Sequence, residues 1–192
     1  TPLVNDDIYK KLEDRVIKPT LKGMQEENAP FEGVLFVGVM VVNGEPIVLE
    51  YNVRFGDPEC EILMPLIESK VSDLFYYGAT KQLDKLDIKI KNKFAVGVVM
   101  ASSNYPYSAS APSIISLSNI VDEELLENSH ISFAGVEKKD DVLLANGGRV
   151  AVCVGLGDTV KEARDRAYLL SSEISFDGKK FRKDIAYQAL KN

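Results

Sequence analysis

The stretch LEYNVRFGDPE, residues 49–59, alternates apolar and polar side chains, a pattern that is typical of a β-strand. Successive side chains of a strand point to opposite faces, so we expect one face of this strand to be apolar. The other face would present the carboxylate of Glu50, the amide of Asn52 and the guanidinium of Arg54. At a rise of about 3.3 Å per residue, these groups would follow one another every ~6.6 Å.

This polar row suggests metal and phosphate chemistry. Glu50 and Asn52 offer hard oxygen donors, and Mg²⁺ in phosphate enzymes is commonly held by one or two such side chains. Arg54 can fork onto a carboxylate or a phosphate. The turn Gly56-Asp57-Pro58 ends the strand, where loop residues can reach a substrate. The structural alternative is an edge strand with one wet face and a salt bridge.

Bulk properties limit the classes of protein. A length of 192 residues suits one domain or two small ones, and the net charge of −6 argues against a nucleic-acid surface. The longest apolar run, residues 34–42, has about the length of a strand and falls short of the roughly 20 residues that span a bilayer. Cys60 and Cys153 show no C-x-x-C spacing, which suits a reducing cytosol. We therefore expect a cytoplasmic protein without nucleic-acid or membrane partners.

In the first half, Asn5 should cap a helix that Pro19 kinks or ends near Lys18. Residues 33–42 predict a strand that is covered on both faces. The pair Asn43-Gly44 predicts a hairpin between that strand and the polar strand. Residues 60–83 read as a helix, and residues 84–92 as a charged connection with an edge strand at 86–90.

In the second half, the pattern predicts strands at 94–101, 113–120 and 131–136, a short helix at 122–127 and a hairpin of 142–145 with 149–156. Cys153 would be a buried packing thiol. Thr159 and Glu162 form a capping box for the last long helix, which ends at 176–178. Residues 184–190 could add a final helical turn.

Three further motifs have competing interpretations. Gly155-Leu156-Gly157 has the position of a dinucleotide loop, but the third glycine is missing, and a turn with a helix cap is favoured. Gly147-Gly148-Arg149 could offer backbone N–H groups and a guanidinium to a phosphate, or simply close a hairpin. His130 is the only histidine, and a loop or strand-start position suits it better than a catalytic triad.

Several stretches resemble the phosphoribosylamine–glycine ligase family, an ATP-grasp family of purine synthesis. The resemblance begins with LEYNVRFGDPE itself and spans the chain, although it covers only the C-terminal part of the family's usual length. Ala111-Pro112 stands where family members often carry a Lys-Gly pair. The other similar stretches are IKPTLKGM (17–24), FEGVLFVG (31–38), ANGGRV (145–150), LGDT (156–159), FDG (176–178) and RKDIAY (182–187).

The resemblance implies an α+β fold in two parts. Residues 1–85 would be the end of an ATP-grasp domain, with an antiparallel sheet and helices, and residues 86–192 a small α+β C-terminal domain. The implied reaction joins glycine to 5-phosphoribosylamine with ATP, through glycyl phosphate, and gives glycinamide ribonucleotide, ADP and phosphate. The implied partner is the missing N-terminal part of the same enzyme, without which we expect this chain to be inactive.

The resemblance also implies roles for single residues. Glu50 and Asn52 would hold Mg²⁺ or Mn²⁺ and, together with Arg54, contact ATP through its phosphates. Arg54 would stabilise the transferring phosphoryl group or the glycine carboxylate. The turn Gly56-Asp57-Pro58 would hold glycine, most directly through Asp57 and the Gly56 backbone. Arg149 would serve the phosphoribosyl side.

Three alternatives stay open at this point. The nearest is another ATP-grasp carboxylate–amine ligase with a different amine acceptor. The second is a non-catalytic module that binds other chains through an exposed sheet edge. The third is a dinucleotide-binding domain built on Gly155 and Gly157.

Overall fold

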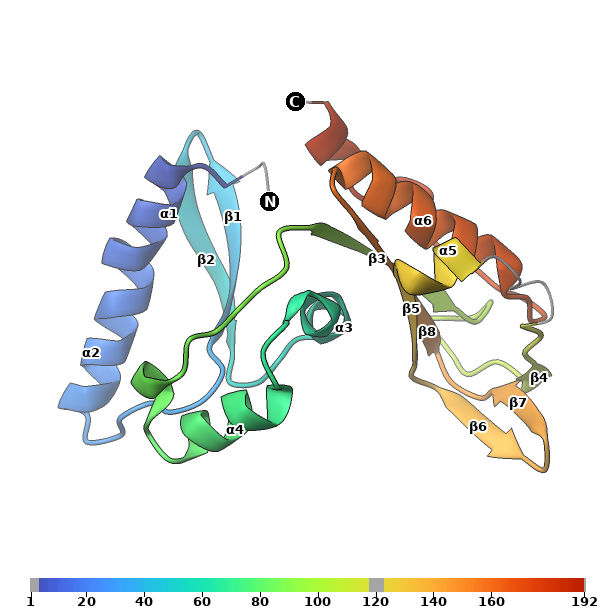
Figure 1. Ribbon diagram of the computed structural model, residues 1–192, viewed down its shortest axis with the longest axis horizontal. Helices are drawn as coiled ribbons and strands as arrows, with labels where there is room; N and C mark the ends of the chain where they lie inside the picture. Colours follow the sequence, from blue (N-terminus) through green and yellow to red (C-terminus); the bar gives the residue numbers. More distant parts are fainter. Residues whose placement is uncertain (1–3, 118–122, 192) are drawn as a thin grey trace. The chain divides into compact units, whose positions relative to one another are not determined.

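The computed structural model describes residues 4–117 and 123–191 (Figure 1). Their helices and antiparallel sheets confirm the predicted α+β class. They divide into two compact units: unit 1 holds residues up to 57 and 69–89, and unit 2 holds 58–68 and 90–191. The sequence-based division at residue 85 stays a prediction, because a compact unit and a family domain need not share their limits.

Unit 1 begins with a helix that passes through Pro19. Helix α1 (Asp6–Leu12) is capped by Asn5, whose Oδ1 accepts a hydrogen bond from the Ile8 N–H at 2.9 Å, as predicted. A π-helical turn (Glu13–Ile17) follows, and α2 (Lys18–Glu26) continues the helix. Of the two predicted effects of Pro19, an end near Lys18 is therefore wrong, and the kink stays a prediction. The Lys18 N–H bonds to the Glu13 carbonyl, five residues back, and this wider turn comes directly before the proline ring that would crowd a regular helix.

The hairpin of unit 1 consists of β1 (Phe36–Val42) and β2 (Glu45–Asn52). Asn43 and Gly44 both have positive φ angles, 52° and 77°, which is the tight turn that their pairing predicted. The expectation that 33–42 is covered on both faces is wrong. Met40 is 53% exposed, because the hairpin is a sheet of only two strands among the described residues.

The helix predicted at 60–83 is divided in two. Helix α3 (Glu59–Leu63) and a 3₁₀ turn (Met64–Leu66) belong to unit 2, whereas α4 (Val71–Ala79) and a 3₁₀ turn (Leu83–Lys85) belong to unit 1. Pro65 has no N–H for a continuing helix, and Ile67 becomes extended and bridges to Ile90. The edge strand predicted at 86–90 is wrong: among the described residues, this segment forms only the isolated bridge of Ile90 with Ile67.

Unit 2 contains two antiparallel sheets of three strands. The first has the order β3 (Phe94–Ala101), β8 (Arg149–Gly157), β5 (Ser129–Phe133). The second has the order β4 (Ser113–Ile114), β7 (Val142–Ala145), β6 (Val136–Lys139). The strand at 94–101 is confirmed. Helix α5 (Glu123–Glu127) confirms the short helix predicted at 122–127, whose first residue lies outside the described part.

Three strand predictions in unit 2 are wrong in detail. The strand at 113–120 is only two residues long as far as residue 117, and residues 118–120 lie outside the described part. The strand at 131–136 is divided between β5 and β6, and β7 and β8 are not a hairpin, because each lies in a different sheet. The chain changes sheets where two glycine loops touch: a Cβ on Gly135 would lie 2.6 Å from the Gly147 Cα.

Helix α6 (Val160–Glu173) packs along β8 and β3 (Figure 1). The Thr159 Oγ1 accepts from the Glu162 N–H at 3.1 Å, which confirms the Thr159 half of the predicted capping box. The Glu162 carboxylate accepts from the Asp158 N–H at 2.9 Å instead of the Thr159 N–H. Gly155 and Gly157 lie inside β8, where a Cβ on Gly157 would come within 2.6 Å of the Ala163 nitrogen. The interpretations of these glycines as a dinucleotide loop or as a turn are therefore both wrong. Gly155 and Gly157 instead allow close contact between β8 and α6.

The core of unit 2 is buried, and Cys153, which is fully buried, is part of it, as predicted. Burial raises the pKa of the Cys153 thiol to about 11, against a lowering effect of its hydrogen bond with Ser171. A 3₁₀ turn (Tyr187–Leu190) confirms the final helical turn, and it begins after Ala186 in the left-handed conformation. No described helix has the length and apolar character that crossing a membrane requires.

Candidate active site

Glu50 and Asn52 lie next to each other near the end of β2. The Asn52 Nδ2 donates a hydrogen bond to the Glu50 Oε1 at 3.3 Å. The Glu50 side chain is exposed, and Asn52 is half-buried. The structure therefore brings these two predicted ligands together with their polar ends in contact.

The position of Glu50 depends on an irregularity in the hairpin. Glu50 pairs with Gly38 and Val48 pairs with Val39, so Leu49 is an extra residue without a partner on β1. Such a bulge breaks the strict alternation of faces. The apolar side chains predicted beneath the row are largely exposed in this two-stranded sheet: Ile47 is 50% exposed and Leu49 62% exposed.

Tyr51 ties the strand to helix α2. Its hydroxyl lies 2.9 Å from the Thr20 Oγ1, which itself lies 2.6 Å from the Val16 carbonyl oxygen. Because a carbonyl only accepts, the Thr20 hydroxyl donates to Val16 and the Tyr51 hydroxyl donates to Thr20. This chain of hydrogen bonds holds the strand between its two site residues.

Arg54 does not belong to the row. Strand β2 ends at Asn52, and the backbone bends at Val53 and Arg54. The Arg54 Nη1 donates to the neighbouring Phe55 carbonyl at 3.2 Å, and its side chain is exposed. The prediction that Arg54 follows Asn52 along a strand face is wrong, because the strand ends two residues before Arg54.

The turn after Arg54 is anchored by an aromatic contact. The rings of Phe55 and Phe75, which lies on α4, meet edge to face with centroids 6.2 Å apart. Both line an apolar cavity of about 720 Å³, beside which Glu32 and Lys81 form an ion pair at 2.6 Å. None of the predicted site residues lines this cavity. The sequence analysis did not identify Phe55 as the residue that anchors this turn. Its position directly before the turn at Gly56 is the signal that could have indicated such a role.

The remaining predicted residues lie on both sides of the unit boundary. Gly56 is buried and Asp57 is exposed at the end of unit 1, whereas Pro58 begins unit 2 directly before α3. Arg149 is half-buried at the start of β8, also in unit 2. Within unit 1, the structure brings Glu50 and Asn52 together through a hydrogen bond.

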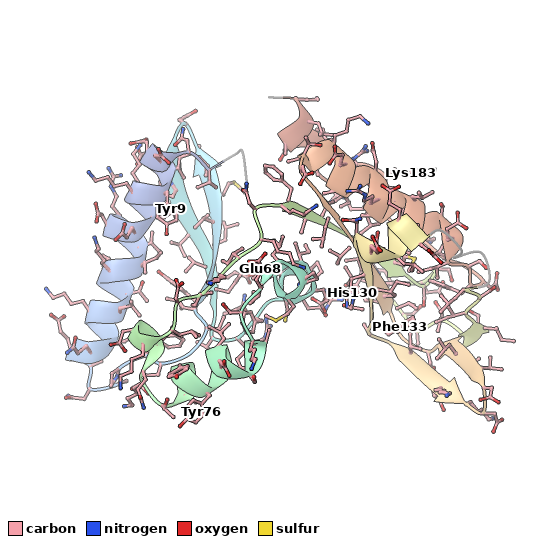
Figure 2. The ribbon with its side chains drawn as sticks, in the orientation of Figure 1. Tyr9, Glu68, Tyr76, His130, Phe133 and Lys183 are labelled. Atoms are coloured by element: carbon pink, nitrogen blue, oxygen red, sulfur yellow. The ribbon has the colours of Figure 1, made fainter. Side chains whose placement is uncertain are left out.

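The loop before Arg149 is held firmly. The Ser102 Oγ donates to the Gly147 carbonyl at 2.6 Å, and the Ser102 N–H donates to the Gly148 carbonyl at 2.9 Å. The Tyr105 ring covers Gly148, where a Cβ would lie 2.6 Å from its Cδ2. Sequence reasoning missed these two residues, although both stand in the serine-rich loop that follows β3. His130 is exposed on β5, one residue after the strand begins, which confirms the strand-start interpretation (Figure 2).

The donor set at Glu50 and Asn52 fits a hard cation. A carboxylate and an amide oxygen are ligands that Mg²⁺ accepts, and Mg²⁺ commonly takes only one or two protein ligands when phosphates supply others. The Asn52 Nδ2 is used by Glu50, which leaves its amide oxygen as the donor to a cation. Among the residues that the structure describes, no group of three or more His, Cys, Asp or Glu side chains forms a metal cluster.

Comparisons with known proteins give a consistent result along the chain. The family described as phosphoribosylglycinamide synthetase, ATP-grasp (A) domain, matches residues 1–60, and the family described as phosphoribosylglycinamide synthetase, C domain, matches residues 95–188. The phosphoribosylamine–glycine ligase of Vibrio parahaemolyticus is 37% identical over 190 residues, which are 98% of this chain and 44% of that protein. The enzyme of the same name from Helicobacter pylori (strain J99) is 33% identical, over 97% of this chain and 44% of its own length.

A solved structure agrees with these relatives. The phosphoribosylamine–glycine ligase of Thermotoga maritima superimposes with a TM-score of 0.76 at 36% identity, over 94% of this chain and 44% of that chain. The present chain thus spans less than half the length of the relatives that it matches.

Proposed function

The chain belongs to the phosphoribosylamine–glycine ligase family, and we propose that it carries one part of the active site of an enzyme that joins glycine to 5-phosphoribosylamine with ATP. The observation that carries this proposal is the contact of Glu50 with Asn52, which lies in the segment matching the ATP-grasp domain. The proposed products are glycinamide ribonucleotide, ADP and phosphate.

The reaction has to activate a carboxylate that resists attack by an amine. A glycine carboxylate oxygen attacks the γ-phosphorus of ATP, the bond to ADP breaks, and glycyl phosphate forms. The amine of phosphoribosylamine then attacks the carbonyl carbon, phosphate leaves, and the amine gives up a proton. A protein promotes such a phosphoryl transfer mainly through position and charge.

We assign Glu50 and Asn52 as ligands of Mg²⁺ or Mn²⁺. A divalent cation held by these two side chains would neutralise charge on the ATP phosphates. The Glu50 carboxylate contributes charge, and the Asn52 amide oxygen contributes a second hard donor. The hydrogen bond between the two side chains limits the freedom of Glu50 before a ligand arrives.

Arg54 and the turn after it are assigned to ATP and glycine. The Arg54 bond to Phe55 is local and exposed, so the guanidinium can leave it for the transferring phosphoryl group or the glycine carboxylate. The Asp57 carboxylate would accept from the glycine ammonium, beside the Gly56 backbone, and Pro58 would fix the shape of the turn. Arg149, at the start of β8 directly after the loop that Ser102 holds, would bind the phosphate of phosphoribosylamine.

The proposed partner is the remaining part of the same enzyme, because this chain spans 44% of its relatives. We further propose a cytoplasmic location and no nucleic-acid or membrane partner, which agrees with the net charge of −6.

Two further functions were among the alternatives open from the sequence. An ATP-grasp carboxylate–amine ligase with a different amine acceptor is disfavoured by the match of the phosphoribosylglycinamide synthetase C domain over residues 95–188. A non-catalytic binding module remains a second candidate, because the exposed Met40 and Ile47 on the hairpin could contact another chain.

The deciding experiment measures ADP release with ATP, Mg²⁺, glycine and phosphoribosylamine. The chain is assayed alone, with the preceding part of a longer relative, and with that part plus a Glu50→Ala version of the chain. Turnover only in the second mixture supports the proposal. Equal turnover in the second and third mixtures contradicts the metal assignment, and no turnover despite a stable complex favours the binding module.

A further inference from the structure

Gly38 faces Glu50 directly across the hairpin, and we propose that Gly38 is a positioning residue for the Glu50 carboxylate. This inference rests on the proposed function, in which Glu50 and Asn52 hold a divalent cation. Gly38 and Glu50 are paired residues in the ladder of β1 and β2. Through this pairing, the residue on β1 decides how much room the Glu50 side chain has.

The Glu50 side chain occupies the space that a side chain on residue 38 would need. A Cβ on Gly38 would lie 2.9 Å from the Glu50 Cγ, 3.5 Å from its Oε1 and 3.7 Å from its Cδ. Two carbon atoms pack favourably at about 3.5–4.0 Å, so the shortest of these contacts would be strongly repulsive. Glu50 therefore lies over bare backbone, and its present conformation requires glycine at position 38.

Backbone conformation does not explain this glycine. Among the described residues, positive φ angles at glycine occur only at Gly33, Gly44 and Gly178, so Gly38 has a backbone that other residues adopt. Glycine inside a strand weakens it, and often marks a place where another group approaches closely. Gly38 stands between valines in the sequence Val37-Gly38-Val39, where a β-branched residue would favour the strand more. The approach of Glu50 is the reason that the structure offers.

The position of Glu50 in turn decides whether the two donors meet. Its Oε1, which lies near Gly38, is the same atom that accepts the hydrogen bond from Asn52. A methyl group at position 38 would push Glu50 into another rotamer and would separate the two side chains. Gly38→Ala is thus a way to disturb the donor pair while leaving both donors present.

The first test is a thermodynamic cycle on this chain. Gly38→Ala should lower the melting temperature by about 2–4 °C in the natural background. In a Glu50→Ala background the same substitution should leave the melting temperature unchanged or raise it, because no side chain then lies over residue 38. If Gly38→Ala alone fails to fold, the double variant should regain the fold. An equal effect of Gly38→Ala in both backgrounds would overturn the inference.

The second test follows the cation without an activity assay. Mn²⁺ broadens the NMR signals of nearby amides, so a titration should selectively broaden residues 50–52 in the natural chain. Loss of ligand orientation typically weakens metal binding by about tenfold or more, and Gly38→Ala should require correspondingly more Mn²⁺. Gly23→Ala is the matched control, since nothing lies within 4 Å of a Cβ on Gly23.

The two tests separate this inference from the proposed function. An unchanged Mn²⁺ requirement in a folded Gly38→Ala chain would refute a positioning role while leaving the metal assignment standing. A natural chain without selective broadening at residues 50–52, but with the expected thermodynamic cycle, would refute the metal assignment itself. A tenfold rise together with the cycle supports both.

Discussion

Glu50→Ala should separate function from stability in the intact enzyme. The Glu50 side chain is exposed, and its one described hydrogen bond, to Asn52, is long at 3.3 Å. We therefore expect the free energy of unfolding to change by no more than about 0.5 kcal/mol, as for other surface substitutions. Loss of a residue that only orients a metal ligand typically weakens metal affinity ~10- to 100-fold. Removal of the ligand Glu50 itself should weaken it by at least as much.

Glu45→Gln is the matched control on the same strand. Glu45 is exposed too, but it forms ion pairs with Lys11 at 2.9 Å and Arg15 at 2.5 Å, and these cations lower the pKa of the Glu45 carboxyl, the Lys11 hydrogen bond most of all. Glu45→Gln should lower the melting temperature slightly and leave the dependence of the rate on Mg²⁺ unchanged.

The assays are thermal and urea unfolding, and the rate of ADP release as a function of Mg²⁺. The two variants should differ in what they change: Glu50→Ala should alter the metal dependence of the rate, and Glu45→Gln should cause a small change in stability. Collapse of the melting transition in Glu50→Ala would show that Glu50 supports the fold. An unchanged Mg²⁺ dependence in the same variant would show that Glu50 is not a ligand.

Three further predictions concern the scaffold of unit 2. Gly155→Ala should destabilise by about 1–3 kcal/mol in urea unfolding, because a Cβ there would lie 2.5 Å from the Ala167 nitrogen; a loss below 0.5 kcal/mol would contradict the close packing. Ala186→Gly should stabilise by about 0.5–1 kcal/mol, since Ala186 has φ 59° and ψ 10°, and a lower melting temperature would contradict this. Cys153 binds its proton more tightly in the folded state, with a pKa raised from 9.0 to about 11, so stability should be complete below pH 9 and fall by ~2–3 kcal/mol as the pH rises to 11. Replacement of Cys153 by Ala should flatten that fall, whereas an equally steep fall would show that other groups cause it.

Features set by neighbouring residues could be predicted from the sequence. The turn at Asn43 and Gly44 follows from which residues tolerate positive φ, and the cap at Thr159 follows from one side chain reaching an N–H three residues on. Features that depend on distant partners could not be predicted. The separation of β7 from β8 depends on the contact of Gly135 with Gly147, which no local pattern contains.

The same distinction applies to the site. Spacing of two along a strand predicts that Glu50 and Asn52 share a face, and the structure brings their side chains together. The same spacing fails for Arg54, because the strand ends first, and periodicity does not report where pairing stops. The bulge at Leu49 was hidden as well, since it arises from the register with β1.

The π-helical turn at Glu13–Ile17 has a consequence for insertions and deletions. A turn that closes over five residues contains one residue more than a regular helix needs, so a homologue with a regular helix here would be one residue shorter. Deletion of that residue would rotate everything after it by about 100°, and Thr20 with it. Deletion of one residue from this turn would therefore also break the Tyr51–Thr20 contact that holds the strand.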